Sequence, residues 1–146
     1  MEEIYQTIPH REPFLFIDRI IEVTETGAVA EREIREDEPH FQGHYPGNPL
    51  MPGVLLCEAI FQTAAVFMVR KFEAEGISGT DKTPILARIK EAKFKQMVRP
   101  GDVIRIETTY KESLSRFHFM RGKVLVNGKI AVSVEFGLAM IDGDGK

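Results

Sequence analysis

The chain has 146 residues, of which 43% are hydrophobic and 28% are charged, and its formal net charge is −3. This length suits one domain, and the apolar content excludes an intrinsically disordered chain, which would lack the residues to offset the entropy of ordering. The single cysteine, Cys57, excludes a disulfide framework, and the acidic balance argues against a general nucleic-acid binder.

The first quarter of the chain is predicted to hold two strands. Residues 1–14 contain no apolar signal core, and together with the lone cysteine this indicates a reducing, cytoplasmic location. Residues 14–23 (FLFIDRIIEV) are apolar and β-branched, which is typical of a strand. Residues 28–36 (AVAEREIRE) indicate a weaker partner strand at an edge of the sheet.

A loop rich in proline and glycine leads into a long apolar helix. Residues 39–53 contain four prolines and three glycines, which excludes a helix or a central strand there, and long ordered loops tend to be functional. The helix is predicted over about 52–75, since Pro52 suits a first helical position and Gly76 a helix end. Thirteen of the sixteen residues from 54 to 69 are apolar, so the helix is expected to be buried. Its polar residues and charged end argue against insertion into a membrane.

The second half of the chain changes to the period of strands. Residues 76–84 are predicted to form a loop, and residues 142–146 a frayed tail. Turns are predicted at Pro100-Gly101-Asp102 and at Asn127-Gly128, because Asn-Gly suits the positive φ angles of a two-residue hairpin. Four strands are expected, over residues 85–95, 103–111, 116–126 and 129–140.

These elements predict one α+β domain over residues 1–146. Residues 129–140 carry apolar side chains at every second position, as expected for an antiparallel strand with one face on the core. A sheet of about six mostly antiparallel strands, wrapped around the long buried helix, is the simplest arrangement that buries both the helix and the apolar face of the strands.

Glu58 is the residue of the helix that most needs an explanation. A carboxylate buried without a partner is costly, so such groups are paired or protonated. Gln62 lies one turn further along, on the same helix face. Glu58 is therefore either a structural carboxylate, hydrogen-bonded or exposed at the helix edge, or a general acid whose pKa rises with desolvation.

The loop before the helix favours the catalytic interpretation. His44 lies in the run GHYPGNP, where prolines stiffen the backbone, and catalysis requires such fixed geometry. Histidine and glutamate are common general acid–base groups. Pro52-Gly53 opens the helix, and the unpaired N–H groups there favour a developing negative charge. A base at His44, an acid at Glu58 and an oxyanion donor at the start of the helix suffice for proton abstraction next to a carbonyl.

Other candidate sites have weaker support. His40 and His44 are four residues apart, but no third ligand clusters near them, so no metal site is expected. Cys57 is interpreted as a buried structural residue, and His10 and His118 as structural or surface residues. A basic run indicates a solvated strand face or, alternatively, a docking patch for an acidic partner; its members are Arg88, Lys90, Lys93, Lys95 and Arg99.

Three blocks of the sequence resemble one enzyme family. Residues 41–62 (FQGHYPGNPLMPGVLLCEAIFQ) closely resemble the signature of the FabZ-type 3-hydroxyacyl-acyl-carrier-protein dehydratases. Residues 8–19 (IPHREPFLFIDR) resemble the opening of that family, and residues 93–102 (KFKQMVRPGD) resemble a later block. The blocks occur in the family's order and, with the strands between them, cover nearly the whole chain.

The resemblance implies a hotdog fold and a hydro-lyase of fatty acid biosynthesis. It implies a homodimer with shared active sites, commonly assembled into a hexamer as a trimer of dimers. His44 would remove the α-proton of a (3R)-3-hydroxyacyl thioester. The partner's Glu58 would then protonate the departing hydroxyl group, which yields a trans-2-enoyl thioester and water.

The resemblance also implies supporting residues and a partner. The backbone N–H of Gly53 is the expected oxyanion donor, Gln62 would fix Glu58, and Tyr45 and Val54 would complete the site. No metal or other cofactor is expected, because the phosphopantetheine arm belongs to the acyl carrier protein that brings the substrate. That carrier is acidic, which gives the basic run a candidate partner.

Some residues depart from the family's pattern, and two other functions stay open. Tyr45 stands where phenylalanine is usual, and His40, Cys57 and Phe61 replace other apolar or small residues; these changes are expected to affect the acyl tunnel rather than the reaction. Glu58, in place of an aspartate, resembles the FabZ branch more than the dehydratase-isomerase branch. The alternatives are a hotdog acyl-thioester hydrolase and a non-catalytic subunit that binds acyl groups or their carrier.

Overall fold

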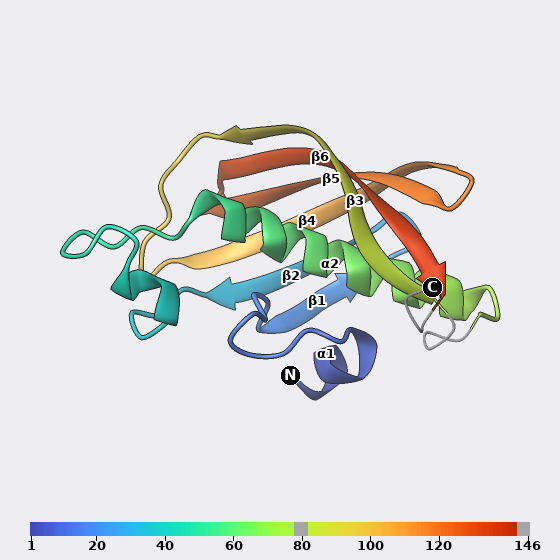
Figure 1. The fold of residues 1–146 in the computed structure, drawn as a ribbon, viewed down its shortest axis with the longest axis horizontal. Helices are drawn as coiled ribbons and strands as arrows, with labels where there is room; N and C mark the ends of the chain where they lie inside the picture. The colour runs from blue at the N-terminus through green and yellow to red at the C-terminus, as the bar shows by residue number, and fades with distance from the viewer. Residues whose placement is uncertain (78–81, 143–146) are drawn as a thin grey trace.

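A long helix lying against one face of a six-stranded sheet forms the core of the protein, as the computed structural model shows (Figure 1). The structure describes residues 1–77 and 82–142. The long helix is α2 (Gly53–Ala74); α1 (Glu2–Thr7) is a short helix, and η1 (Pro39–Gln42) is a single 3-10 turn. The strands are β1 (Arg19–Val23), β2 (Gly27–Glu33), β3 (Lys82–Phe94), β4 (Val103–Leu114), β5 (Phe117–Val126) and β6 (Lys129–Asp142).

The sheet is antiparallel at every pairing and follows the order β1-β2-β4-β5-β6-β3. Strand β2 precedes α2 in the chain and pairs with β1 and β4, whereas β3, which follows α2, pairs with β6 at the other edge. The chain therefore crosses from one side of the sheet to the other through α2. The two edges are therefore the five-residue β1 and the thirteen-residue β3. The predicted α+β architecture, a mostly antiparallel sheet wrapped around one helix, is confirmed.

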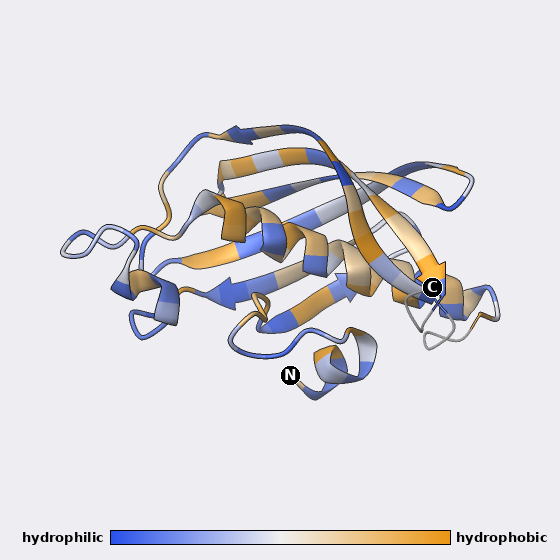
Figure 2. Cartoon of the chain, in the orientation of Figure 1, coloured by the Kyte–Doolittle hydropathy of each residue, from blue (hydrophilic) through white to orange (hydrophobic). Residues whose placement is uncertain are grey.

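Helix α2 is buried because nearly every face of it is apolar. Residues 59–69 are all buried, and Figure 2 shows hydrophobic residues along α2 and on the strands that lie against it. By length and apolar content the helix could cross a membrane, but 72% of its most apolar window lies inside this fold. It is a core helix and not a membrane span.

The predicted turns are confirmed, and the strands that flank them differ from prediction by a few residues at their ends. Asn127 and Gly128 have φ angles of +52° and +78° and join β5 to β6, as the hairpin signal requires. The N–H of Asp102 donates to the carbonyl of Arg99 over 3.0 Å and closes the turn before β4. Strand β3 begins at Lys82, inside the predicted loop over 76–84, and part of that loop lies outside the described residues.

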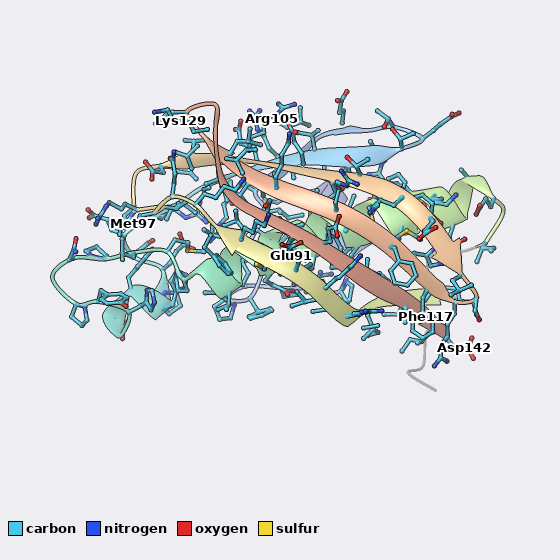
Figure 3. All side chains as sticks on the ribbon, turned by 90° about the horizontal axis from the view of Figure 1, so that it is seen from above. Glu91, Met97, Arg105, Phe117, Lys129 and Asp142 are labelled. Carbon is cyan, nitrogen blue, oxygen red and sulfur yellow. The ribbon has the colours of Figure 1, made fainter. Side chains whose placement is uncertain are left out.

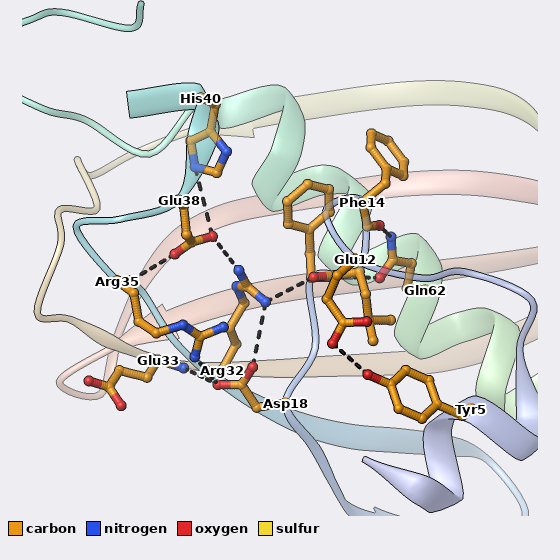
Figure 4. A network of polar contacts seen from close by, with 12 residues as sticks. Tyr5, Glu12, Phe14, Asp18, Arg32, Glu33, Arg35, Glu38, His40 and Gln62 are labelled. Carbon is orange, nitrogen blue, oxygen red and sulfur yellow. Dashed lines mark hydrogen bonds and ion pairs between the residues drawn. The ribbon is translucent and has the colours of Figure 1, made fainter. Parts of the chain in front are cut away.

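The strand predicted over 14–23 is wrong in its first half, since β1 begins only at Arg19. The side chain of Gln62 takes the place of a neighbouring strand there. Its Nε2 donates to the carbonyl of Phe14, and its Oε1 accepts from the N–H of Phe16, both over 2.8 Å (Figure 4). Residues 14–18 therefore form an irregular segment that covers the core and is held by hydrogen bonds to α2, and they are not part of a β-strand.

Three further differences lie near the ends of elements. Strand β2 stops at Glu33, short of the predicted 28–36, because its partner β4 begins opposite it at Val103. It lies between β1 and β4, so the predicted place at an edge of the sheet is wrong. The short helix α1 was not predicted, and the 3-10 turn η1 occupies part of the loop for which a helix was excluded. Asp142 is the last residue of β6, so the first residue of the predicted tail over 142–146 belongs to a strand, and residues 143–146 lie outside the described residues.

The helix and the sheet approach each other closely at Gly122 of β5. An added Cβ there would lie 2.2 Å from Cγ2 of Ile60 on α2, far inside van der Waals contact. A glycine is thus required for the sheet to approach α2 this closely.

We expect Gly122→Ala to destabilise the fold by about 1–3 kcal/mol, because overpacking a filled core costs this much. The measurement is the midpoint of urea unfolding at fixed protein concentration. Gly43→Ala is the matched control, because a Cβ at Gly43 meets nothing within 4 Å. Equal midpoints for the two variants would contradict the prediction.

Candidate active site

The loop before α2 fixes the backbone around His44. The N–H of Asn48 donates to the carbonyl of Tyr45 over 2.9 Å and closes a turn around Pro46 and Gly47. Gly47 has a φ of +84°, and proline followed by such a glycine is the pattern of a type II turn. The rigidity predicted from the prolines of this loop therefore has a specific geometric cause.

The ring of His44 is oriented by the loop that carries it. Its Nδ1 lies 2.7 Å from the carbonyl oxygen of Leu50. A carbonyl only accepts, so Nδ1 carries the proton of the neutral ring and Nε2 is left as a free base. The exposed ring of Tyr45 packs edge-on against the imidazole, with 4.7 Å between centroids. This tautomer is the one that a general base requires.

Glu58 lies in the first turns of α2, where the helix is less buried than in its middle. Its side chain is 20% exposed, and Val54, one turn earlier on the same side, is 71% exposed. Burial raises the pKa of Glu58 above its usual value of 4.5, and the hydrogen bond from Gln62 lowers it in part. A carboxyl group that holds its proton to higher pH than usual is suited to act as a general acid.

Gln62 connects Glu58 to the N-terminal segment. It is fully buried, and its Nε2 also donates to Oε1 of Glu58 over 3.2 Å. The same amide bonds the main chain of Phe14 and Phe16 (Figure 4). Gln62 therefore does donate a hydrogen bond to Glu58, as predicted. Its amide cannot rotate without breaking the hydrogen bonds to Phe14 and Phe16.

The helix begins at Gly53, as the predicted oxyanion donor requires. The N–H groups of Leu55 and Leu56 bond the carbonyl of Pro52, so the N–H groups before them have no acceptor within the helix. An added Cβ at Gly53 would lie 2.7 Å from the ring of Phe94, at the end of β3. Glycine is thus what allows β3 to come this close to the N-terminus of α2.

The catalytic candidates lie on two elements of the chain. His44 is on the loop and Glu58 is on α2, and no hydrogen bond or ion pair joins them within residues 1–77 and 82–142. Cys57 is buried, as predicted, and burial raises the pKa of its thiol to about 11. No cluster of three or more metal-ligating side chains occurs in the described parts of the chain.

His10 lies beside Glu58, which the sequence reasoning missed. Its Nε2 is 3.7 Å from Oε1 of Glu58, and burial lowers the pKa of the imidazole, with a smaller contribution from Arg11. The prediction had treated it as a structural or surface histidine. The one signal that pointed to it was its position in the segment 8–19, which resembles the family's opening.

A buried ion pair fixes the start of the loop and was not predicted. Arg32 on β2 donates to the carboxylate of Glu38 and, over 2.9 Å, to the carbonyl of Leu15 (Figure 4). The second oxygen of Glu38 accepts from the N–H of Arg35 over 2.7 Å. His40 lies 3.8 Å from Glu38. The charges that face each other here hold β2, the N-terminal segment and the loop of His44 together.

The basic run lies on the surface, and three of its members are on β3. Figure 3 shows the sheet from above, with Glu91 on β3. Lys93 lies 3.5 Å from Glu91, and Lys90 lies 3.9 Å from Glu135 on β6. Arg99 donates to Asn48 over 2.7 Å, next to the loop of His44. Acidic neighbours thus offset part of the positive charge that the sequence predicts.

Curated relatives match nearly the whole chain. A family model described as the FabA-like domain matches residues 8–135. The 3-hydroxyacyl-[acyl-carrier-protein] dehydratase FabZ of Clostridium perfringens is 40% identical over 140 residues, which cover 96% of this chain and 97% of that protein. The dehydratase of the same name from Caldicellulosiruptor saccharolyticus is 42% identical over 139 residues, with 90% and 96% covered.

Solved structures share the fold at much lower identity. One chain of the dehydratase heterocomplex ApeI:P from Xenorhabdus doucetiae aligns with a TM-score of 0.82 at 15% identity, over 97% of this chain and 93% of that chain. A hypothetical thioesterase with coenzyme A from Streptococcus pneumoniae aligns with a TM-score of 0.65 at 10% identity, with the same coverage. The hotdog fold expected from the sequence is therefore confirmed, and that fold carries more than one activity.

The raised pKa of Glu58 predicts a pH-dependent stability. Below its usual value of 4.5, Glu58 is protonated in both the folded and the unfolded state, so its burial is not penalised there. As the pH rises through the higher pKa of the folded state, a charge is forced into a desolvated position and stability is lost. Glu58→Gln removes this titration, so the variant should gain stability relative to wild type between pH 4.5 and neutral pH. Urea unfolding at each pH measures this difference, and a difference that is constant or shrinks would contradict it.

Proposed function

Because the chain belongs to the FabZ-type 3-hydroxyacyl-[acyl-carrier-protein] dehydratases, within the FabA-like domain family, we propose that His44 and Glu58 perform that dehydration here. The reaction converts a (3R)-3-hydroxyacyl-[acyl-carrier-protein] to the trans-2-enoyl form in fatty acid biosynthesis. The orientation of His44, with Nε2 left free by the bond to Leu50, is the observation that carries this proposal.

The first step is removal of the α-proton. Nε2 of His44 accepts the proton from the carbon next to the thioester carbonyl, and negative charge develops on the carbonyl oxygen. The N–H groups at the start of α2, at Gly53 and Val54, supply donors and the positive end of the helix dipole for that oxygen. The electron pair of the broken C–H bond is held in the enolate and forms the new C=C bond only when the hydroxyl group leaves.

The second step is loss of the hydroxyl group. Glu58 gives its proton to the hydroxyl oxygen, the C–O bond breaks with its electron pair, and water leaves. Glu58 is then ionised and His44 protonated, and proton return from His44 to Glu58, directly or through water, restores the starting state. The reaction transfers protons and breaks a C–O bond without any net oxidation or reduction, so the proposal requires no redox cofactor.

Dimerisation through β3 is part of the proposal. This edge strand is thirteen residues long, and on the side away from β6 its backbone pairs with no other strand described in the structure. Exposed hydrophobic side chains lie along it, namely Ile85, Leu86, Ile89 and Phe94. Long apolar edges invite pairing with another chain, and a second copy of β3 offers the matching edge.

Such a dimer would complete the active site. Phe94, the last residue of β3, lies against Gly53 at the start of α2. The more exposed residues of the first turns of α2, Val54 and Glu58, therefore lie next to the edge of β3. A partner chain seated there would bring its own His44 to Glu58, and the arrangement would repeat by symmetry. The trimer of dimers and the cytoplasmic location implied by the resemblance stay predictions.

The outer face of the sheet is the proposed docking surface for the carrier protein. Arg88, Lys90 and Lys93 line grooves there with Arg121 and Lys123 of β5, and this face remains exposed when the backbone edge of β3 is paired. Lys95 and Arg99 continue the basic run toward the loop of His44. Glu91, Glu107 and Glu135 line the same grooves and offset part of this positive charge.

We expect His44→Ala or Glu58→Ala to lower kcat about 100-fold or more, because each removes a general acid–base group. The assay follows dehydration of a 3-hydroxyacyl-[acyl-carrier-protein], and thermal unfolding verifies that each variant folds. Normal turnover by either variant would exclude the assigned roles, and release of free thiol would indicate a hydrolase instead.

Mixing the two variants tests whether the sites are shared. After joint refolding, half of the dimers are mixed, and each mixed dimer has one intact site, so about a quarter of wild-type activity should return. Each variant refolded alone is the control. No recovery on mixing would contradict a site built from two chains.

The docking surface has its own test. We expect Lys90→Glu combined with Lys93→Glu to raise KM for the acyl carrier substrate roughly 3- to 10-fold at low salt, because exposed charges contribute modestly and are screened. The same acyl group on a short pantetheine thioester is the control, and its KM should not change. An equal rise for both substrates would contradict docking at this face.

A further inference from the structure

We propose that His10 is a positioning residue for Glu58, and that it donates its Nε2–H to the Glu58 carboxylate as this acid gives up its proton. The proposal rests on the proposed function of Glu58 and adds a residue to it. Its first observation is the 3.7 Å between Nε2 of His10 and Oε1 of Glu58, across the boundary between the N-terminal segment and α2.

The backbone that carries His10 is fixed by its neighbour Arg11. One guanidinium nitrogen donates to the carbonyls of His10 and Ile8, over 2.6 and 2.9 Å, and the other donates to the carbonyl of Tyr5 over 2.9 Å. The hydroxyl of Tyr5 in turn donates to Glu12 over 2.5 Å (Figure 4). The two residues that follow His10 thus link this turn to Tyr5 of α1.

The surroundings of the ring select one tautomer. The side chain of His10 is 26% exposed, and its Nδ1 is buried and finds no partner among the residues that the structure describes. A buried N–H without an acceptor is rarer and more costly than a bare lone pair, so the proton belongs on Nε2, which faces Glu58. Burial lowers the pKa of His10, so the ring is neutral at neutral pH and acts as a hydrogen-bond donor without a fixed charge.

The groups that face Glu58 come from two parts of the chain. Gln62 on α2 donates to Oε1, and His10 approaches from the N-terminal segment. The guanidinium of Arg11 is held by main-chain carbonyls, and the partner's His44 would face Glu58 only in the proposed dimer. Among the residues that the structure describes, His10 and Gln62 are therefore the two side-chain donors that face the carboxylate.

These donors matter most when the charge appears. Glu58 forms its carboxylate in a position where burial disfavours charge, and hydrogen bonds to an ionised group are roughly twice as strong as neutral ones. At 3.7 Å the contact is too long for a hydrogen bond in the resting state. Catalytic contacts are often long without substrate and tighten as the reaction proceeds. His10 would therefore stabilise the product of proton transfer more than the starting acid.

The test compares two substitutions of His10. His10→Leu removes the donor and should lower kcat roughly 10-fold with little change in KM, while the limb of the pH profile that reports Glu58 moves to higher pH. His10→Gln keeps an amide N–H near the position of Nε2 and should retain most of kcat. His118→Gln is the matched control, because His118 is another buried histidine, on β5, which bonds the hydroxyl of Tyr110 over 3.1 Å. It should leave kcat and the pH profile unchanged.

A second measurement is independent of activity. Infrared titration follows the carboxyl band of Glu58, which is assigned by its loss in Glu58→Gln, and His10→Leu should raise the pKa that it reports. If the wild-type chain shows no dehydration, the proposed function fails while this titration still decides the role of His10. An unchanged titration in His10→Leu, or an equal loss of activity in both substitutions without a shift of the pH profile, would overturn the proposal.

Discussion

The side-chain amide of Gln62 is the interaction on which the rest of the structure depends. It is fully buried in the middle of α2, and it satisfies the main chain of Phe14 and Phe16 while donating to Glu58. Leaving such buried groups unpaired costs about 1–3 kcal/mol each, so the segment and the helix are fixed together. The same contacts determine where the chain before β1 runs, and therefore where His10 lies. One polar side chain in an apolar helix thus links the packing of the core to the geometry of the acid.

Much of the fold could be predicted because it follows from hydrophobic period. The alternation in β6, the Asn127-Gly128 turn and the apolar faces of α2 are local signals, and the structure has each element where its signal lies. The run from Phe14 to Asp18 was mistaken for strand because its composition is that of a strand. Its backbone is instead hydrogen-bonded by a side chain 46 residues away in sequence, which no window of neighbouring residues can reveal.

The candidate site was predictable to the same extent. His44 and Glu58 stood out because a histidine in a proline-fixed loop and a glutamate in an apolar helix are locally unusual. His10 did not stand out, because a single histidine near a chain end carries no local signal. Its contact with Glu58 depends on the bonds of Arg11 and Gln62, which form only when α1, the segment and α2 are packed. Residues that act through another residue are the ones that sequence patterns miss.

The unpaired edge of β3 and the separation of His44 from Glu58 are two features of this short chain that a second copy of it would resolve. Strand β3 has apolar side chains that no part of the described chain covers, and a monomer with such an edge is prone to associate. The proposed base, His44, is on a loop and the proposed acid, Glu58, is on α2, and no hydrogen bond or ion pair joins them in the described part of the chain. The two features meet at the start of α2, where the ring of Phe94, the last residue of β3, lies against Gly53. Pairing two β3 edges would therefore cover the apolar surface and complete two sites at once, so the interaction that protects the fold would also be the one that assembles the chemistry.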